Sequence, residues 1–163
     1  MNQEDLLKNK KILIVDDEPD ILEVLADLLP MCQVVNASSF EEAKVLLDTQ
    51  SFDMAILDIM GVEGYKLLEI ANKKKVTAVM LTAHALSPDN IVKSYKEGAA
   101  SYIPKEEMAN ILSFLNDILD AQKKGKNVWG RWLDRLDAYL AKRFGHDWQK
   151  NDKEFWEKFP FYE

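Results

Sequence analysis

Hydrophobic and polar positions in residues 1–125 alternate between two kinds of segment. Short apolar runs rich in β-branched residues lie at residues 11–15, 32–35, 53–57, 76–81 and 101–103. Stretches with the period of amphipathic helices follow them, roughly at residues 19–29, 39–49, 63–73, 88–97 and 106–122. Continuous apolar strands that alternate with helices are typical of a parallel sheet covered on both faces. Five such units are too few for an eight-fold barrel, so the pattern predicts an open, doubly wound α/β sheet.

Capping signals agree with this division into elements. Ser38 or Ser39, followed by two glutamates, is typical of a helix N-terminus. Pro88 after Ser87 fits the first turn of the fourth helix, where its missing N–H costs nothing. Gly98 can adopt the left-handed conformation that ends that helix.

The composition changes after residue 122, which predicts a domain at residues 1–122, a polar linker at 123–127 and a C-terminal extension at 128–163. The extension contains all four tryptophans of the chain. Its first part predicts an amphipathic helix that ends at Gly145, and its second a short helix capped by Asn151. The apolar residues expected on these helices are Trp129, Trp132, Leu133, Leu136, Leu140, Phe144, Phe155, Trp156 and Phe159.

Two interpretations of the extension stay open at this point. Its aromatic residues either enlarge the core, by packing on the preceding domain or on a second copy, or form a docking surface for a partner. A DNA-reading domain is not expected, because residues 126–163 carry 8 Lys and Arg against 7 Asp and Glu and contain no basic run.

Bulk composition narrows the class of protein. The net charge of −7 argues against non-specific nucleic-acid binding. No apolar run approaches the roughly 18–20 residues of a membrane span, and the polar start shows no secretory leader. Cys32 is the single cysteine, which excludes an intramolecular disulfide. We therefore expect a cytoplasmic protein.

Polar side chains stand where the predicted strands end. Asp16 and Asp17 follow the first strand, Asp58 the third and Thr82 the fourth, and Lys105 lies just past the fifth. The carboxyl ends of parallel strands share one edge of a sheet, where functional groups gather. Crowded carboxylates repel one another and lose hydration, so they need a cation or a proton. The acids therefore either cap a helix or hold a metal.

These groups lie in the motifs VDDEPD, LDIM, MLTAH and GAASYIPK. In this order the motifs resemble the receiver domain of two-component response regulators, over about residues 9–122. The resemblance implies a chemotaxis-receiver-like, flavodoxin-like fold with strand order 2-1-3-4-5. It also implies a signalling domain rather than an enzyme, acting as a stand-alone receiver.

The same resemblance implies a magnesium-dependent phosphoacceptor site. Mg²⁺ would be held by Asp16, Asp17, Asp58 and the backbone carbonyl of Met60. A histidine kinase or phosphotransfer protein would phosphorylate Asp58, and Thr82 and Lys105 would contact the transferred oxygens.

The resemblance implies a switch as well. Thr82 and Tyr102 would rearrange and reshape the face made by residues 88–97, 101–103 and 106–122 for an unknown protein target or for a homodimer.

The chain departs from the family in two loops. Residues 59–63 form a shorter loop than is usual in the family and lack the common proline, so the position of the Met60 carbonyl as a metal ligand depends on this loop. By the same resemblance, Met60 and His84 flank the expected path of hydrolytic water. Pro104 precedes Lys105, where the family has a proline after the lysine. The isomer of the Ile103–Pro104 bond stays open.

Two other classes of protein are alternatives to a receiver. Haloacid-dehalogenase-type phosphatases also use an aspartyl phosphate, but their nucleophile comes early and their acid pair late, which is the reverse of the order here. The second alternative is a phosphate-independent receiver-like module for interaction or dimerisation, against which the complete set of five side chains argues.

Overall fold

The computed structural model of the chain describes residues 6–83 and 87–159. Five parallel strands form one sheet in the order β2-β1-β3-β4-β5, which confirms the predicted fold class and strand order. The strands are β1 Lys11–Val15, β2 Gln33–Ala37, β3 Met54–Asp58, β4 Thr77–Thr82 and β5 Ser101–Pro104.

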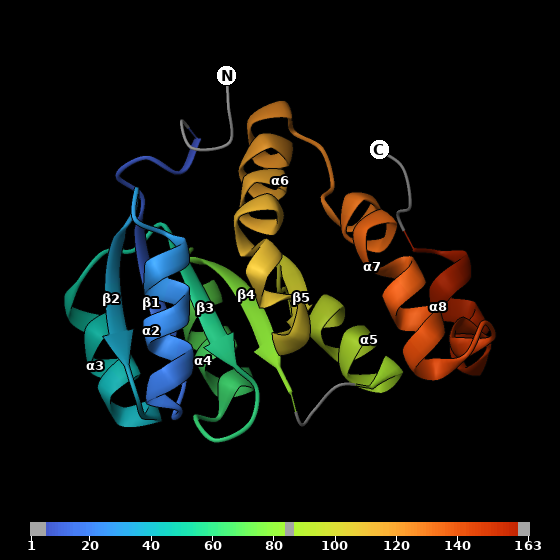
Figure 1. The fold of residues 1–163 in the computed structure, drawn as a ribbon, viewed down its shortest axis with the longest axis horizontal. Coiled ribbons are helices and arrows are strands. Elements are labelled where there is room, and N and C mark those ends of the chain that lie inside the picture. The colour runs from blue at the N-terminus through green and yellow to red at the C-terminus, as the bar shows by residue number, and fades with distance from the viewer. Residues whose placement is uncertain (1–5, 84–86, 160–163) are drawn as a thin grey trace.

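Helices cover both faces of this sheet, with α2 and α6 in front and α3 and α4 behind in Figure 1. Every residue of β3 is buried, as expected for a strand between two helical layers. The helices that follow the five strands are α2 Pro19–Leu28, α3 Phe40–Thr49, α4 Gly64–Lys73, α5 Pro88–Lys96 and α6 Ile111–Lys124.

Two predicted caps are confirmed. The Ser39 side chain accepts a hydrogen bond from the Glu42 N–H at 3.2 Å and so begins α3. Ser87 accepts from the Asn90 N–H at 3.1 Å, with Pro88 in the first turn of α5. Each serine therefore satisfies a backbone donor that the helix itself leaves unpaired.

The last predicted helix of the domain, residues 106–122, begins later than expected. Residues Lys105–Asn110 form a 3-10 helix, η1, and α6 starts only at Ile111. No residue of η1 is buried, so no apolar stripe holds this stretch against the sheet as a regular α-helix. Helix α6 runs to Lys124 and ends at Gly125 with φ of 67°, which lies inside the predicted linker.

The C-terminal extension forms α7 Trp129–Phe144, the 3-10 helix η2 Trp148–Asp152 and α8 Lys153–Glu157. It lies beside α5 and α6, in orange and red in Figure 1. Gly145 ends α7 as predicted. The predicted cap of α8 was wrong by one residue: the N-cap is Asp152, whose side chain accepts from the Phe155 N–H at 3.1 Å. Among the described residues, every helix is too short or too polar to span a bilayer.

Candidate functional site

Asp58 is the last residue of β3, and its side chain lies at the carboxyl edge of the sheet. It is only 5% exposed. Asp16 follows β1 directly, is fully buried, and is held by its backbone N–H, which donates to the Ala37 carbonyl at 3.1 Å. The strand register thus brings together two carboxylates that are 42 residues apart in sequence, as predicted.

Lys105 joins the carboxylates into one cluster. Its Nζ lies 2.9 Å from Asp16 Oδ2, 3.1 Å from Glu18 Oε1 and 3.5 Å from Asp58 Oδ1. Only 9% of the lysine side chain is exposed. The Ile103–Pro104 bond is trans, which resolves the open question about its isomer.

Thr82 lies at the same edge, at the end of β4. It is 1% exposed and pairs in register with Pro104, the residue before Lys105. Its neighbour Leu81 pairs with Asp58. The structure therefore places the predicted hydroxyl between the strand that carries the acid and the strand that leads to the lysine.

Two glycines and one acid at the site escaped the sequence prediction. A Cβ on Gly61, whose φ is +82°, would lie 2.7 Å from Asp17 Oδ2, and a Cβ on Gly64 would lie 2.2 Å from the Asp58 carbonyl oxygen. The turn after β3 therefore approaches the Asp58 backbone too closely for a side chain at position 64, whereas a side chain at position 61 would displace the Asp17 carboxylate. The run of acids in VDDEPD contained Glu18, but nothing in the sequence showed that Lys105 reaches it.

Met60 lies in this turn, and 53% of its surface is exposed. The Met60 carbonyl as a metal ligand stays a prediction. His84, which was expected beside the path of hydrolytic water, lies outside the described residues.

We expect Gly64→Ala to damage the site. The new methyl group must displace the backbone of Asp58 or Ile59, an overpacking cost of about 1–3 kcal/mol, and the shift moves the Asp58 carboxylate. Phosphoryl labelling from acetyl phosphate should therefore fall severalfold. Gly125→Ala is the matched control, because a Cβ there meets open space and costs only the strain of its φ of +67°, about 1–2 kcal/mol. Equal labelling of the two variants would show that the Gly64 contact does not position Asp58.

The pKa shifts of the site residues indicate that the nearby positive charge does not balance the crowded carboxylates. Burial raises the pKa of Asp58 to about 7, and the nearby carboxylate of Asp16 adds to the rise. Burial also raises the pKa of Asp16. Burial alone would lower the pKa of Lys105, but its contacts with Asp16 and Glu18 outweigh burial and raise it. One ammonium therefore does not fully offset the acids.

The donor set fits a hard divalent cation. One carboxylate oxygen from each of Asp16, Asp17 and Glu18 lies within 4.8 Å of the others. Asp16 Oδ2 is buried and, within the described part of the chain, has the Lys105 ion pair but no hydrogen bond of regular geometry. Mg²⁺ prefers one or two carboxylates and keeps several waters, and the exposure of Asp17 and Glu18 leaves room for them.

Tyr102 lies in β5 and contacts the start of α5. It is fully buried, and its hydroxyl accepts from the Ser87 N–H at 3.4 Å at the start of α5. Burial raises the pKa of this hydroxyl, so it stays a neutral phenol. Its role as a switch residue stays a prediction.

The parallel sheet with strand order 2-1-3-4-5 is flavodoxin-like, and an acidic cluster with a lysine lies at its strand ends. The sequence model of the response regulator receiver domain family matches residues 12–116 of this chain. The chain therefore belongs to the response regulator receiver domain family.

Curated relatives and solved structures agree. The chain is 34% identical to the two-component response regulator ARR10 of Arabidopsis thaliana over 72% of this chain and 23% of that protein. It is 39% identical to the probable transcriptional regulator ycf27 of Guillardia theta over 68% of this chain and 47% of that protein. The chain thus spans less than half the length of these relatives.

The fold is also that of isolated receivers. The CheY-like receiver domain protein from Methanospirillum hungatei superposes with a TM-score of 0.65 at 33% identity, covering 72% of this chain and 99% of that one. A response regulator receiver domain protein from Clostridium thermocellum superposes with a TM-score of 0.60 at 28% identity, covering 70% of this chain and 97% of that one. The family model ends at residue 116, so the C-terminal extension lies beyond it.

Proposed function

We propose that this receiver accepts a phosphoryl group on Asp58 from a histidine kinase or phosphotransfer protein and signals through protein contacts. The observation that supports the proposal is the convergence of Lys105 on Asp16 and Asp58, three side chains that are each less than 10% exposed. Burying a carboxylate costs free energy unless a cation or a proton neutralises its charge, and such buried, perturbed carboxylates are often functional.

The chain's own residues divide the work of the transfer. A carboxylate oxygen of Asp58 attacks the phosphorus of a phosphohistidine, an O–P bond forms, and the N–P bond breaks with its electron pair left on the imidazole nitrogen. The Lys105 ammonium stabilises negative charge on the transferred phosphoryl group near Asp58, and the Thr82 hydroxyl is a hydrogen-bond donor at the same edge. Water later hydrolyses the acyl phosphate to inorganic phosphate and restores Asp58.

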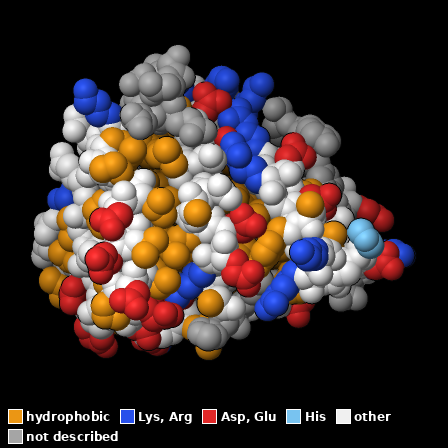
Figure 2. Space-filling model, in the orientation of Figure 1, with side chains coloured by type: hydrophobic (Ala, Val, Ile, Leu, Met, Phe, Trp, Pro, Cys, Tyr) orange, Lys and Arg blue, Asp and Glu red, His pale blue; other side chains and the backbone are white. Residues whose placement is uncertain are grey.

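Asp16, Asp17 and Asp58 would hold Mg²⁺, with the Met60 carbonyl as a further protein ligand and Glu18 close by. When bound, Mg²⁺ neutralises charge between the anionic donor and the anionic nucleophile. Figure 2 shows acidic side chains gathered over α2 and the strand ends below it, so the site lies in a negative field that disfavours phosphoryl donors without a cation.

Signalling would use the surface formed by α5, β5 and α6, which we call the switch surface. Thr82 and Tyr102 connect this surface to Asp58, because Thr82 ends β4 and Tyr102 lies in the paired strand β5. An altered position of either residue on phosphorylation would change how the switch surface binds other proteins.

The test is phosphoryl labelling of the intact chain. We expect acetyl phosphate with Mg²⁺ to add one phosphoryl group, seen by mass spectrometry, and we expect EDTA to abolish it because the acids then lack their cation. Labelling of equal extent in EDTA would contradict metal dependence. A complete lack of labelling in Mg²⁺ would favour the phosphate-independent interaction module instead.

A further inference from the structure

The C-terminal extension covers the switch surface. Helix α7 lies beside α5 and α6 (Figure 1). Trp132 Nε1 donates a hydrogen bond to the Tyr102 carbonyl oxygen at 2.6 Å, and Trp132 itself is 1% exposed. The contact is therefore dry, where a lost hydrogen bond is costly.

An ion pair fixes the orientation of α7 on α6. Arg135 binds the Asp117 carboxylate through two nitrogens, the second contact being 3.1 Å from Nη2 to Oδ1. Arg131 binds Asp120 one turn further along α6 at 2.9 Å. Asp117 is only 9% exposed, so this acid of the receiver would be left buried beside an apolar surface without the arginine.

Aromatic rings join the extension to α5. The Tyr95 ring lies 5.3 Å from Trp129, 5.4 Å from Phe155 and 5.4 Å from Phe159, measured between ring centroids. Both parts of the extension, α7 and the segment around α8, therefore meet on one receiver side chain.

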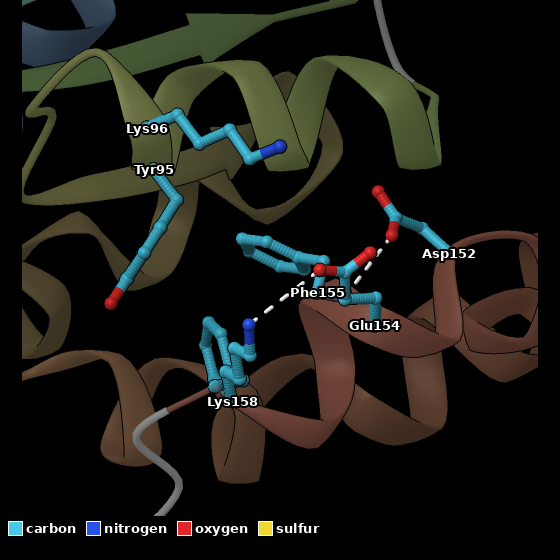
Figure 3. A pocket seen from close by; sticks show the side chains of 7 residues that line it. Tyr95, Lys96, Asp152, Glu154, Phe155 and Lys158 are labelled. Atoms are coloured by element: carbon cyan, nitrogen blue, oxygen red, sulfur yellow. Dashed lines mark hydrogen bonds and ion pairs between the residues drawn. The ribbon is translucent and has the colours of Figure 1, made fainter.

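The packing is looser at the far end of the extension. An open pocket of about 390 Å³ lies between α5 and α8 beside these ring contacts, and Figure 3 shows Lys96, Lys158 and Glu154 around it. The interface is thus dry around Trp132 and open to water around α8, which suits a segment that can detach.

Among the described residues of the extension, no large apolar side chain is exposed while the extension is docked. Its large apolar side chains are buried: Trp129, Trp132, Leu133, Leu136, Leu140, Trp148, Trp156 and Phe159. Among the described residues, the exposed large apolar side chains, Val24, Val45 and Met60, all belong to the receiver. The occupant of the switch surface is therefore this chain's own extension.

We propose that residues 128–159 are a built-in ligand of the switch surface whose docking is coupled to the state of Asp58, so that phosphorylation releases them. This inference rests on the proposed function. Release uncovers the surface for a protein that presents an aromatic anchor and arginines, as α7 does now.

The path of the coupling is short. Tyr102 carries the carbonyl that Trp132 binds, and Lys105, three residues on, holds Asp16 and Glu18. A phosphoryl group on Asp58 draws Lys105 away from Glu18 and so moves the end of β5. Because the Trp132 contact is short and buried, a small shift of the Tyr102 carbonyl weakens it. By linkage, docking and phosphorylation then oppose each other.

The four tryptophans, all in the extension, give a direct readout in the intact chain. We expect beryllofluoride with Mg²⁺, a phosphoryl mimic, to shift tryptophan emission to longer wavelength and to increase acrylamide quenching. The docking equilibrium should fall roughly five-fold or more, the lower end of typical allosteric coupling. Asp58→Asn should show no change on the same treatment.

Two variants on α7 separate docking from general effects. Arg135→Ala removes the partner of Asp117 and should raise quenching even without beryllofluoride, whereas Lys142→Ala, at an exposed position of the same helix, should behave as wild type. Acetyl phosphate labelling of Asp58 is measured in parallel. Labelling with unchanged emission would overturn the inference and leave the proposed function intact, and an absence of labelling would overturn both. A response that depends on protein concentration would show exchange with a second copy and contradict an intramolecular ligand.

Discussion

Asp58→Asn is expected to abolish phosphoryl labelling of the chain by acetyl phosphate and Mg²⁺. The amide is nearly the same size as the carboxylate but lacks the anionic oxygen that attacks phosphorus. Asp58 is 5% exposed at the end of a fully buried strand, so the sheet fixes its position. Mass spectrometry of the intact protein measures the result, and equal labelling of wild type and variant would refute the assignment of the nucleophile.

The same variant makes a separate prediction about stability. Burial and the Asp16 carboxylate raise the pKa of Asp58 to about 7 from 3.8, so the folded state binds its proton more tightly than the unfolded state. The ionised form therefore costs stability as the pH rises from about 4 through about 7. At pH 8 without divalent cations, we expect Asp58→Asn to melt at a higher temperature than wild type. Added Mg²⁺ should stabilise wild type more than the variant, and a lower melting temperature for the variant would contradict crowding of the acids.

Trp132→Ala is expected to weaken the packing of the extension by about 3–5 kcal/mol, the usual cost of removing a buried tryptophan. The change removes a side chain that is 1% exposed and leaves the buried Tyr102 carbonyl without its donor. Urea unfolding followed by emission of the three remaining tryptophans should begin at lower denaturant than in wild type. Far-ultraviolet circular dichroism, which reports the whole fold, should show a smaller shift if the receiver stays folded when the extension detaches.

Trp132→Phe separates the hydrogen bond from the packing. Phenylalanine keeps most of the apolar contact but has no N–H, so we expect an intermediate loss of about 1–3 kcal/mol, the cost of removing one partner of a buried hydrogen bond. Val45→Ala, at a position 59% exposed on α3, should change stability by less than about 0.5 kcal/mol. If Trp132→Ala unfolds like the Val45 control, the extension does not depend on the receiver.

The strand ends were the part of the site that sequence reasoning located best. Apolar runs that stop at Asp16, Asp58 and Thr82 place these residues at one edge of a parallel sheet, whatever the loops do. The predicted start of the helix after β5 was less accurate, because residues 105–110 lack the apolar stripe that marks an α-helix and form η1 instead. The close approach of Gly61 and Gly64 to the acids was missed, since it depends on the path of one turn.

The sequence by itself determined the elements, the sheet and the set of polar groups at its edge, because periodicity and strand-end position are local properties of the chain. The apolar faces of the extension were also determined. Only the tertiary structure decided that Lys105 reaches Glu18 and that Trp132 lies on the Tyr102 carbonyl. The physical reason is that hydrophobic burial is non-directional: an amphipathic helix must cover its apolar face, but its sequence does not say which surface covers it.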